Sequence, residues 1–151
     1  MTPSAYITKI VLFLILIVTA MTLHAQDLQK HQWEHRILIV HTTDADSEKF
    51  VDQLQAFNGQ EKGLIERKLI LYKIIGNQLE LLDFKNSRPL DSGTISENFI
   101  YKYLQNTNDF KIILLGLDGG IKLQQESILS IDTLFNTIDA MPMRQREMNK
   151  Q

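Results

Sequence analysis

The chain contains no cysteine among its 151 residues. Disulfide bonds, thiolate nucleophiles and cysteine-ligated zinc are therefore all excluded, and the fold must be stabilised by its core. An excess of basic residues is also missing, because 16 Lys and Arg stand against 18 Asp and Glu, for a net charge of −2. A nucleic-acid-binding domain needs a basic face, so this balance argues against nucleic acid as a partner.

The longest apolar run lies near the N-terminus, at residues 10–20, and follows the single charge of Lys9. The small residue Ala25 comes shortly after it. This order is typical of a secretory signal peptide cleaved after Ala25, and it predicts export to the periplasm or the extracellular space, with no membrane association after cleavage. An uncleaved membrane anchor is the alternative, although a spanning helix needs roughly 20 apolar residues. The expected organisation is a signal peptide (1–25), a single domain (26–148) and a tail (149–151).

Aliphatic runs alternate with one-sided apolar stripes along the rest of the chain. Continuous β-branched runs predict buried strands of the kind found in parallel sheets, and two shorter runs that follow turn residues predict further strands. Apolar stripes at helical spacing predict three helices, of which the second opens with a capping box at 94–97. The predicted strands are 37–40, 69–75, 79–82, 110–115 and 121–123, and the predicted helices are 47–57, the segment after 94–97, and 128–141.

This order of elements, β-α-β-(β)-α-β-β-α, predicts the fold class. Helices must cover both faces of a mixed sheet whose first strands are parallel, and the last two strands form a C-terminal β-hairpin before a final helix. The hairpin turn is expected at Asp118-Gly119-Gly120, and Pro142 is expected to end or kink the last helix. Residues 58–63 and 83–93 are expected to be loops. The predicted fold is an α/β, thioredoxin-like three-layer sandwich.

Three motifs are too particular to follow from a generic fold. Trp33 and Arg36 form a Trp-x-x-Arg pair before the first strand. The hairpin contributes Gly116, Asp118, Gly119, Gly120 and Lys122, and the C-terminal run contributes Ile138, Asp139, Met141, Pro142, Met143, Arg144, Glu147 and Met148. Together these residues resemble a family of uncharacterised domains of secreted bacterial proteins. The same domain, called the DUDES domain, recurs in vertebrate extracellular proteins of the sushi-repeat and Equarin type.

The resemblance implies a thioredoxin-like fold, for which an oxidoreductase role has been suspected, although a fold does not fix a function. In such a domain the reactive position follows the first strand, which here is the segment 42–46. Thiol–disulfide exchange needs a thiolate, so it is excluded whatever the fold. Asp44 and Asp46 are interpreted instead as helix caps. Leu117 stands where the family usually has lysine, which weakens any anion site that would use that lysine.

Two weak metal-site candidates are present. His31 and His35 belong to a His-x-x-Glu-His pattern, which chelates zinc when it lies on a helix of a large catalytic domain. In this short chain a chance match on a surface segment is the simpler interpretation. Met141 and Met143 could bind Cu(I) through their sulfur atoms, but packing in the helix stripe and over the sheet edge is the favoured interpretation. No metal and no cofactor is therefore expected.

The basic residues of the C-terminal motif suggest a binding site. Arg144, Arg146 and Glu147 follow the proline, and with Arg36 and Lys122 they could form a pocket for an anion or a partner. The alternative is an ion-paired clasp that holds the tail, with Glu147 or Asp139 paired to an arginine. An open cleft would favour the pocket, and a buried, paired cluster would favour the clasp.

No convincing catalytic set accompanies these candidates. The sequence therefore predicts a non-catalytic binding or interaction module, whose partner is an unknown protein or a small anionic ligand. The alternative is a cysteine-independent, redox- or peroxide-linked oxidoreductase of the thioredoxin-like class. That enzyme would require a bound metal or methionine redox cycling, since no thiol is present.

Overall fold

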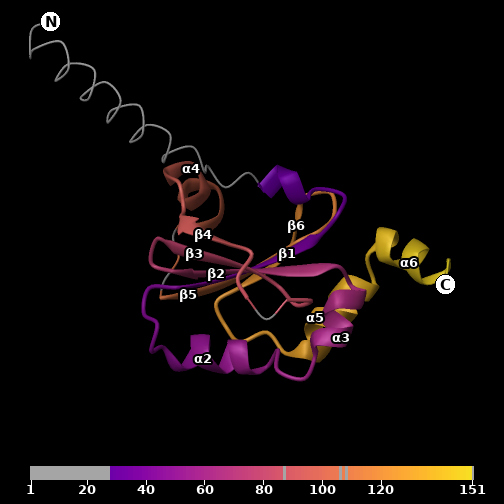
Figure 1. Ribbon diagram of the computed structural model, residues 1–151, viewed down its shortest axis with the longest axis horizontal. Helices are drawn as coiled ribbons and strands as arrows, with labels where there is room; N and C mark the ends of the chain where they lie inside the picture. The colour runs from indigo at the N-terminus through magenta and orange to yellow at the C-terminus, as the bar shows by residue number, and fades with distance from the viewer. Residues whose placement is uncertain (1–27, 87, 106, 108, 151) are drawn as a thin grey trace, which may run out of the picture.

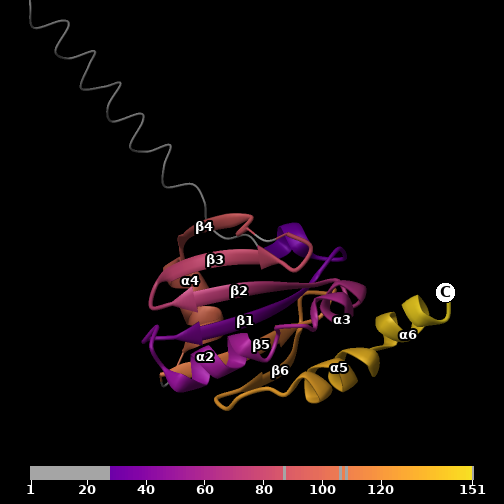
Figure 2. The same cartoon turned by 60° about the horizontal axis from the view of Figure 1, so that its bottom comes forward.

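A six-stranded mixed sheet with the order β4-β3-β2-β1-β5-β6 forms the centre of the protein (Figures 1 and 2). The computed structural model describes residues 28–150 apart from 87, 106 and 108, so the expected signal peptide lies outside the described residues. The strands are β1 (Arg36–Thr42), β2 (Leu69–Ile75), β3 (Gln78–Asp83), β4 (Asp91–Thr94), β5 (Phe110–Leu115) and β6 (Ile121–Gln125).

Helices cover both faces of this sheet. Figure 1 shows α4 on one side and α2, α3 and α5 on the other. The helical segments are the 3₁₀-helix η1 (Leu28–His31), α2 (Glu48–Gln55), α3 (Glu61–Glu66), α4 (Glu97–Phe99), the π-helical η2 (Ile100–Leu104), α5 (Ile131–Asp139) and α6 (Pro142–Met148). In the part of the chain that the structure describes, no helix is long and apolar enough to cross a membrane.

The central strand β1 shows why the sheet has a core on each face. Every residue of β1 is buried, and successive side chains of a strand point to opposite faces. Ile37 and Ile39 pack with Phe99 and Tyr103 of the α4–η2 segment. The alternate residues of β1 pack in the second core, with α2, α3 and α5. An uninterrupted aliphatic run is therefore required here, as expected for a strand covered on both sides.

The strand pairing confirms the predicted α/β class with a mixed sheet. β1 and β2 are parallel, whereas β5 runs antiparallel to β1 and β6 antiparallel to β5. The hairpin between β5 and β6 turns at Gly119, whose φ of +76° is the left-handed value that the Asp-Gly-Gly turn predicts. The main-chain N–H of Gly116 donates to the carbonyl of Gly120 at 2.9 Å and closes this turn.

The predicted exit loop at 58–63 was wrong in part, because α3 begins at Glu61 and includes Gly63. The glycine is needed for packing rather than for a turn. A Cβ atom on Gly63 would lie 2.7 Å from the ring of Phe135 in α5, closer than nonbonded carbon atoms approach, so the ring would have to move. Glycine therefore lets two helices come together here, and a sequence pattern cannot distinguish this use from a loop.

The region before α4 also differs from the prediction. The segment expected to be loop contains β4, which pairs with β3 through Gln78↔Thr94 and takes the edge of the sheet. Thr94 is therefore a strand residue and not a helix cap. The cap is Ser96, whose hydroxyl accepts from the main-chain N–H of Phe99 at 3.2 Å. The pairing of β4 with β3 therefore extends the strand to Thr94 and moves the start of the helix to Ser96.

The C-terminus contains a second helix that was not predicted. α5 ends at Asp139, and Pro142 begins α6 rather than ending the chain's regular structure. Proline is favoured in the first turn of a helix because the N–H groups there have no intrahelical partner. The C-terminal run of the family motif is thus helical.

Candidate functional site

The C-terminal motif is held in a cluster of charged side chains, which we call the clasp. It joins α6 to the start of β1 and to the segment between α3 and β2. Its residues are Arg36, Glu66, Arg67, Lys68, Asp139, Arg144 and Glu147. Lys68 takes a left-handed φ of +53°, which reverses the chain after α3. Its carbonyl accepts from the N–H of Arg36 at 2.8 Å, so the chain segments meet here.

Arg144 is the centre of the clasp, and its side chain is only 1% exposed. Its Nε donates to Asp139 at 3.1 Å, its Nη1 donates to the carbonyl of Glu66 at 3.2 Å, and its Nη2 pairs with the Glu66 carboxylate. Burial by itself lowers the pKa of Arg144, but the hydrogen bonds that it donates to the carboxylates of Glu66 and Asp139 outweigh burial and raise this pKa. The guanidinium is therefore charged and already bound.

Arg36 is the second buried cation of the clasp. Its Nη1 donates to the carbonyl of Arg67 at 2.8 Å and to the carboxylate of Glu147 at 3.3 Å. Burial lowers the pKa of Arg36 more than Glu147 raises it. Its Nε and Nη2 are buried without a hydrogen-bond partner in the described part of the chain. Glu147 balances this charge, and Lys68 Nζ binds the same carboxylate at 3.3 Å.

Asp139 links the two halves of the clasp. Arg67 Nη2 donates to its Oδ2 at 2.5 Å, and Arg144 Nε donates to its Oδ1. Burial alone raises the pKa of Asp139, but the bonds from Arg67 and Arg144 outweigh it and hold this pKa below the ordinary 3.8. The guanidinium of Arg67 also lies 4.0 Å above the ring of Phe135, which fixes its plane.

The remaining two candidates for an anion pocket lie apart from these contacts. Lys122, in β6, pairs with Asp118 at 2.7 Å, and this bond is the main cause of the lowered pKa of Asp118. Arg146 is exposed on α6, with no ion pair among the described residues. The structure thus brings Arg36, Arg144 and Glu147 together in the paired form expected of a clasp. Their role in binding an anion or partner stays a prediction.

The histidine pattern does not lie on an α-helix. His31 ends the 3₁₀-helix η1, and Trp33 takes a left-handed φ of +71° before His35. His31 Nε2 lies 3.0 Å from the hydroxyl of the buried Tyr72, and the rings of His31 and His35 meet edge to face at 5.8 Å. Within residues 28–150, excepting 87, 106 and 108, no three His, Asp or Glu side chains gather as a metal site would require.

The methionine candidates stand at the junction of α5 and α6. Met141 is the N-cap residue of α6 and packs against the core on the α5 face. Met143 is 36% exposed, in the first turn of α6. Packing accounts for Met141, as expected, and nothing in the described contacts tests the weak copper candidate at Met141 and Met143.

The segment 42–46, at the carboxyl end of β1, is closed by its own hydrogen bonds. Thr42 Oγ1 donates to the carbonyl of Asp44 at 2.9 Å, and Asp44 Oδ1 accepts from the N–H of Asp46 at 3.0 Å. The prediction that Asp44 or Asp46 caps α2 was wrong, because Ser47 is the N-cap residue and makes no side-chain cap bond. The aspartates stabilise a turn before the helix instead.

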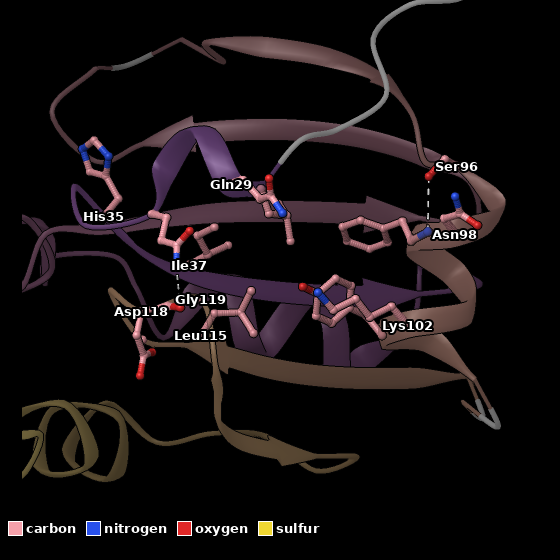
Figure 3. Close-up of a pocket in the computed structure, with 14 residues that line it drawn as sticks. Gln29, His35, Ile37, Ser96, Asn98, Lys102, Leu115, Asp118 and Gly119 are labelled. Atoms are coloured by element: carbon pink, nitrogen blue, oxygen red, sulfur yellow. Dashed lines mark hydrogen bonds between the residues drawn. The ribbon is translucent and has the colours of Figure 1, made fainter.

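A groove of about 750 Å³ opens near the amino end of β1, between η1, the α4–η2 segment and the hairpin turn (Figure 3). The main-chain N–H of Trp33 donates to the carbonyl of Leu117 at 2.7 Å and fastens η1 to the hairpin. The floor and lower walls are apolar, formed by Leu28, Ile37, Phe99, Tyr103 and Leu115. The volume is typical of small-molecule sites.

The rim of this groove is polar and comes from three chain segments. Figure 3 shows Gln29 above the groove, Asn98 and Lys102 at one end, and Asp118 and Gly119 at the other. Amide side chains carry both donors and acceptors, so this rim can bond to either kind of ligand group. The polar lining residues are Gln29, Gln32, His35, Ser96, Asn98, Lys102 and Asp118.

Sequence reasoning missed most of this groove. In the sequence, Asn98 and Lys102 have the pattern of ordinary polar positions of a helix. Their spacing of four residues indicates only that they share a helix face. Gln32 lies 86 residues from Asp118, to whose carbonyl it donates at 2.9 Å. Such a long-range contact leaves no local signal. One indication was present in the sequence. The Trp-x-x-Arg motif before β1 and the glycine-rich hairpin both belong to the family pattern, and the hydrogen bond from Trp33 to Leu117 joins these two segments beside the groove.

Comparison with known proteins places the chain in a family. Among curated proteins it is similar to coiled-coil domain-containing protein 80 of Danio rerio, with 26% identity over 133 residues. The alignment covers 80% of this chain and 15% of the relative, so the chain spans about a seventh of that protein's length. The family model described as a domain of unknown function (DUF4174) matches residues 27–147. The protein therefore belongs to this DUF4174 family of domains of unknown function.

Proposed function

We propose that the protein is an exported, thioredoxin-like binding module and that the groove is its binding site. The observation that carries this proposal is the groove itself, whose apolar floor and polar rim form a preformed concave site. The clasp is less suited to a ligand, because Arg144 and the Nη1 atom of Arg36 are already bonded to carboxylates and carbonyls. The other two nitrogen atoms of the Arg36 guanidinium are buried from solvent.

The strand pairing supports the thioredoxin-like part of the proposal. In the four strands β2-β1-β5-β6, β1 and β2 are the parallel neighbours and β5 runs antiparallel to the strands on each side of it, as in thioredoxin-like domains; β3 and β4 extend the sheet at one edge. The usual reactive position of that fold is occupied by the hydrogen-bonded turn at 42–46. Binding at the opposite, amino end of β1 would therefore use a different part of the same scaffold, consistent with the rule that sites vary on a shared fold.

Export is supported by the composition of the leader, with Lys9 before an apolar run and Ala25 at the expected cleavage point. Intact mass measurement after expression in a bacterium tests this part. A chain that begins at Gln26 in the periplasm or medium is expected. A full-length chain retained in the membrane fraction would favour the anchor instead.

The binding site is tested by titrating a library of small acidic, basic, neutral and apolar compounds into the isotope-labelled protein and following its amide NMR signals. Shifts concentrated at the groove residues Gln32, Asn98 and Lys102 are expected. Asn98→Trp, which fills the groove, should abolish them. The matched control is Glu97→Trp, because Glu97 is the exposed neighbour that does not line the groove. Shifts confined to residues 42–49, or none at the groove, would overturn the proposal.

A further inference from the structure

The guanidinium of Arg36, in the clasp, uses only part of its hydrogen-bonding capacity within the fold. Its Nη1 atom donates to the carbonyl of Arg67 and to the carboxylate of Glu147. Its Nε and Nη2 atoms are buried and make no hydrogen bond to any residue that the structure describes. The side chain is 0% exposed, so bulk water does not reach these two donors. Buried polar groups are almost always hydrogen-bonded, and these donors therefore call for an acceptor.

The two donors belong to one edge of a rigid, planar group. In a guanidinium the N–H bonds of Nε and Nη2 point in parallel and form a fork, so one acceptor can bind both of them. Arg36 lies on the same face of β1 as Leu38 and Val40, because alternate residues of a strand share a face. Leu38 and Val40 belong to the aliphatic core, and their side chains carry no acceptor for this fork.

The clasp as a whole carries one positive charge in excess. Its ion pairs join four cationic side chains to three carboxylates, namely Arg36, Arg67, Lys68 and Arg144 to Glu66, Asp139 and Glu147. The carboxylate of Glu147 lies 3.3 Å from both Arg36 and Lys68. The same carboxylate lies 3.7 Å from Arg144. Glu147 is therefore shared by three cations and balances Arg36 only in part, and a buried charge that is not fully paired is costly.

Size and chemistry restrict the acceptor to a small anion. The donors are closed off from solvent, so a carboxylate or phosphate group of another molecule could not reach them while the clasp is intact. A water molecule could accept both hydrogen bonds, but it brings no charge and needs further polar partners for its own hydrogen atoms. A halide ion needs no such partners and supplies the missing negative charge.

We propose that the clasp binds one chloride ion at the edge of Arg36 formed by Nε and Nη2. The ion accepts both N–H groups, neutralises the excess charge of the clasp and so stabilises the packing of α6 against the start of β1. It is a structural ion held within the fold, and the carboxylate partners of the arginines stay in place. This inference goes beyond the proposed function, because it concerns the clasp and does not depend on the groove.

Bromide can replace chloride and can be located directly by its anomalous scattering. A crystal of protein produced from the full chain and soaked in sodium bromide is expected to show an anomalous peak within hydrogen-bond distance of both Nε and Nη2 of Arg36. A water molecule at this place, without an anomalous signal, would overturn the proposal. Bromide bound only at the protein surface would overturn it as well.

Unfolding in solution tests whether chloride binds the folded state. Urea unfolding is measured in sodium chloride and in sodium gluconate of equal ionic strength, since both salts then screen the ion pairs equally and gluconate is too large for the site. A tenfold rise in chloride above its dissociation constant should raise the ratio of folded to unfolded protein about tenfold, by mass action. Gluconate should give no such rise. Equal stability in the two salts would overturn the proposal, because bromide in the crystal would then show binding at crystal concentration only.

Two lysine variants test the role of the excess charge. Lys68→Gln removes a cation that shares Glu147, and it should weaken the chloride effect severalfold. Lys62→Gln is the matched control, because Lys62 is an exposed lysine of α3 that lies outside the clasp, and it should leave the effect unchanged. Both side chains lie at the surface, so both variants are expected to fold. An undiminished chloride effect in Lys68→Gln would contradict the assignment of the ion to this site.

Discussion

The clasp and the groove are both built from elements far apart in the sequence, and both contain basic side chains. They differ in whether those side chains are buried and paired with carboxylates. In the clasp, Arg36 and Arg144 are buried and bonded to carboxylates and carbonyls from three segments. In the groove, Lys102 is exposed and has no carboxylate partner within the part of the chain that the structure describes. The charges of the clasp are therefore used within the fold, whereas the ammonium group of Lys102 faces solvent at the groove that we propose as the binding site.

This difference follows from the cost of burying charge. A buried ion whose partner is removed is strongly destabilising. The arginines of the clasp therefore could not exchange their carboxylate partners for a ligand without loss of stability. An exposed ammonium keeps its hydration and costs the fold little. Mutations should therefore affect stability in the clasp and ligand binding in the groove.

The largest effect is expected at Arg144. Arg144→Ala should lower the free energy of unfolding by about 3 kcal/mol, because it removes a buried side chain together with its charge-assisted hydrogen bonds to Glu66 and Asp139. Arg146→Ala, in the same helix but exposed, should change it by less than about 0.5 kcal/mol. Urea unfolding followed by circular dichroism measures both. Equal effects of the two variants would contradict the assignment of the clasp.

Asp139→Asn should have a smaller effect that depends on pH. The loss of two charge-assisted hydrogen bonds should cost about 1.5–3 kcal/mol at neutral pH. The pKa of Asp139 is lowered by folding, so its contribution is present above the ordinary value of 3.8 and is lost as the pH falls through the lower folded value. The melting temperatures of wild type and variant should therefore converge below about pH 4. A constant difference at all pH values would show that the charge of Asp139 is not involved.

The turn beside the groove depends on backbone conformation rather than on charge. Gly119→Ala should cost about 1–2 kcal/mol, because alanine is strained at a φ of +76° although space for its Cβ exists. Gly120→Ala is the matched control, since Gly120 does not take a positive φ, and it should cost less than about 0.5 kcal/mol. Thermal denaturation distinguishes the two. A larger loss at Gly120 would contradict the turn geometry.

The smallest effect on stability is expected at Lys102. Lys102→Gln should change the free energy of unfolding by less than about 0.5 kcal/mol, because the side chain is exposed and makes no ion pair in the described residues. Urea unfolding is again the measurement. A loss comparable to that of Arg144→Ala would show that Lys102 is a structural residue and that the groove and the clasp do not differ in kind.

The predicted strands at 37–40, 69–75 and 110–115 were confirmed because an aliphatic run has few alternatives once both faces of a sheet are covered. The errors occurred where a distant partner decided the outcome. Gly63 lies in α3, where the ring of Phe135 occupies the space that a side chain would fill, and Thr94 lies in a strand because β3 pairs with it. The interior of strong elements could be predicted, whereas boundaries that depend on tertiary contacts could not.

The residues of the clasp were likewise predictable only in part. The sequence identified Arg36, Arg144 and Glu147 as residues to consider, and left open whether they form a pocket or a clasp. Their arrangement depends on Glu66, Arg67 and Asp139, which are brought in by α3 and α5. No periodic pattern links these positions, because charge pairing over such separations leaves no local trace.

By itself, the sequence determined the absence of thiol chemistry, the α/β class and the membership of a domain family, since these follow from composition, local periodicity and short motifs. Only the tertiary structure decided which charged side chains form ion pairs that stabilise the fold and which stay exposed to solvent without such a pair. Burial is a property of the packed molecule, and the same lysine or arginine has a different role depending on whether a carboxylate reaches it. Arg144 and Lys102 show this difference, because only the carboxylates around Arg144 make its burial tolerable.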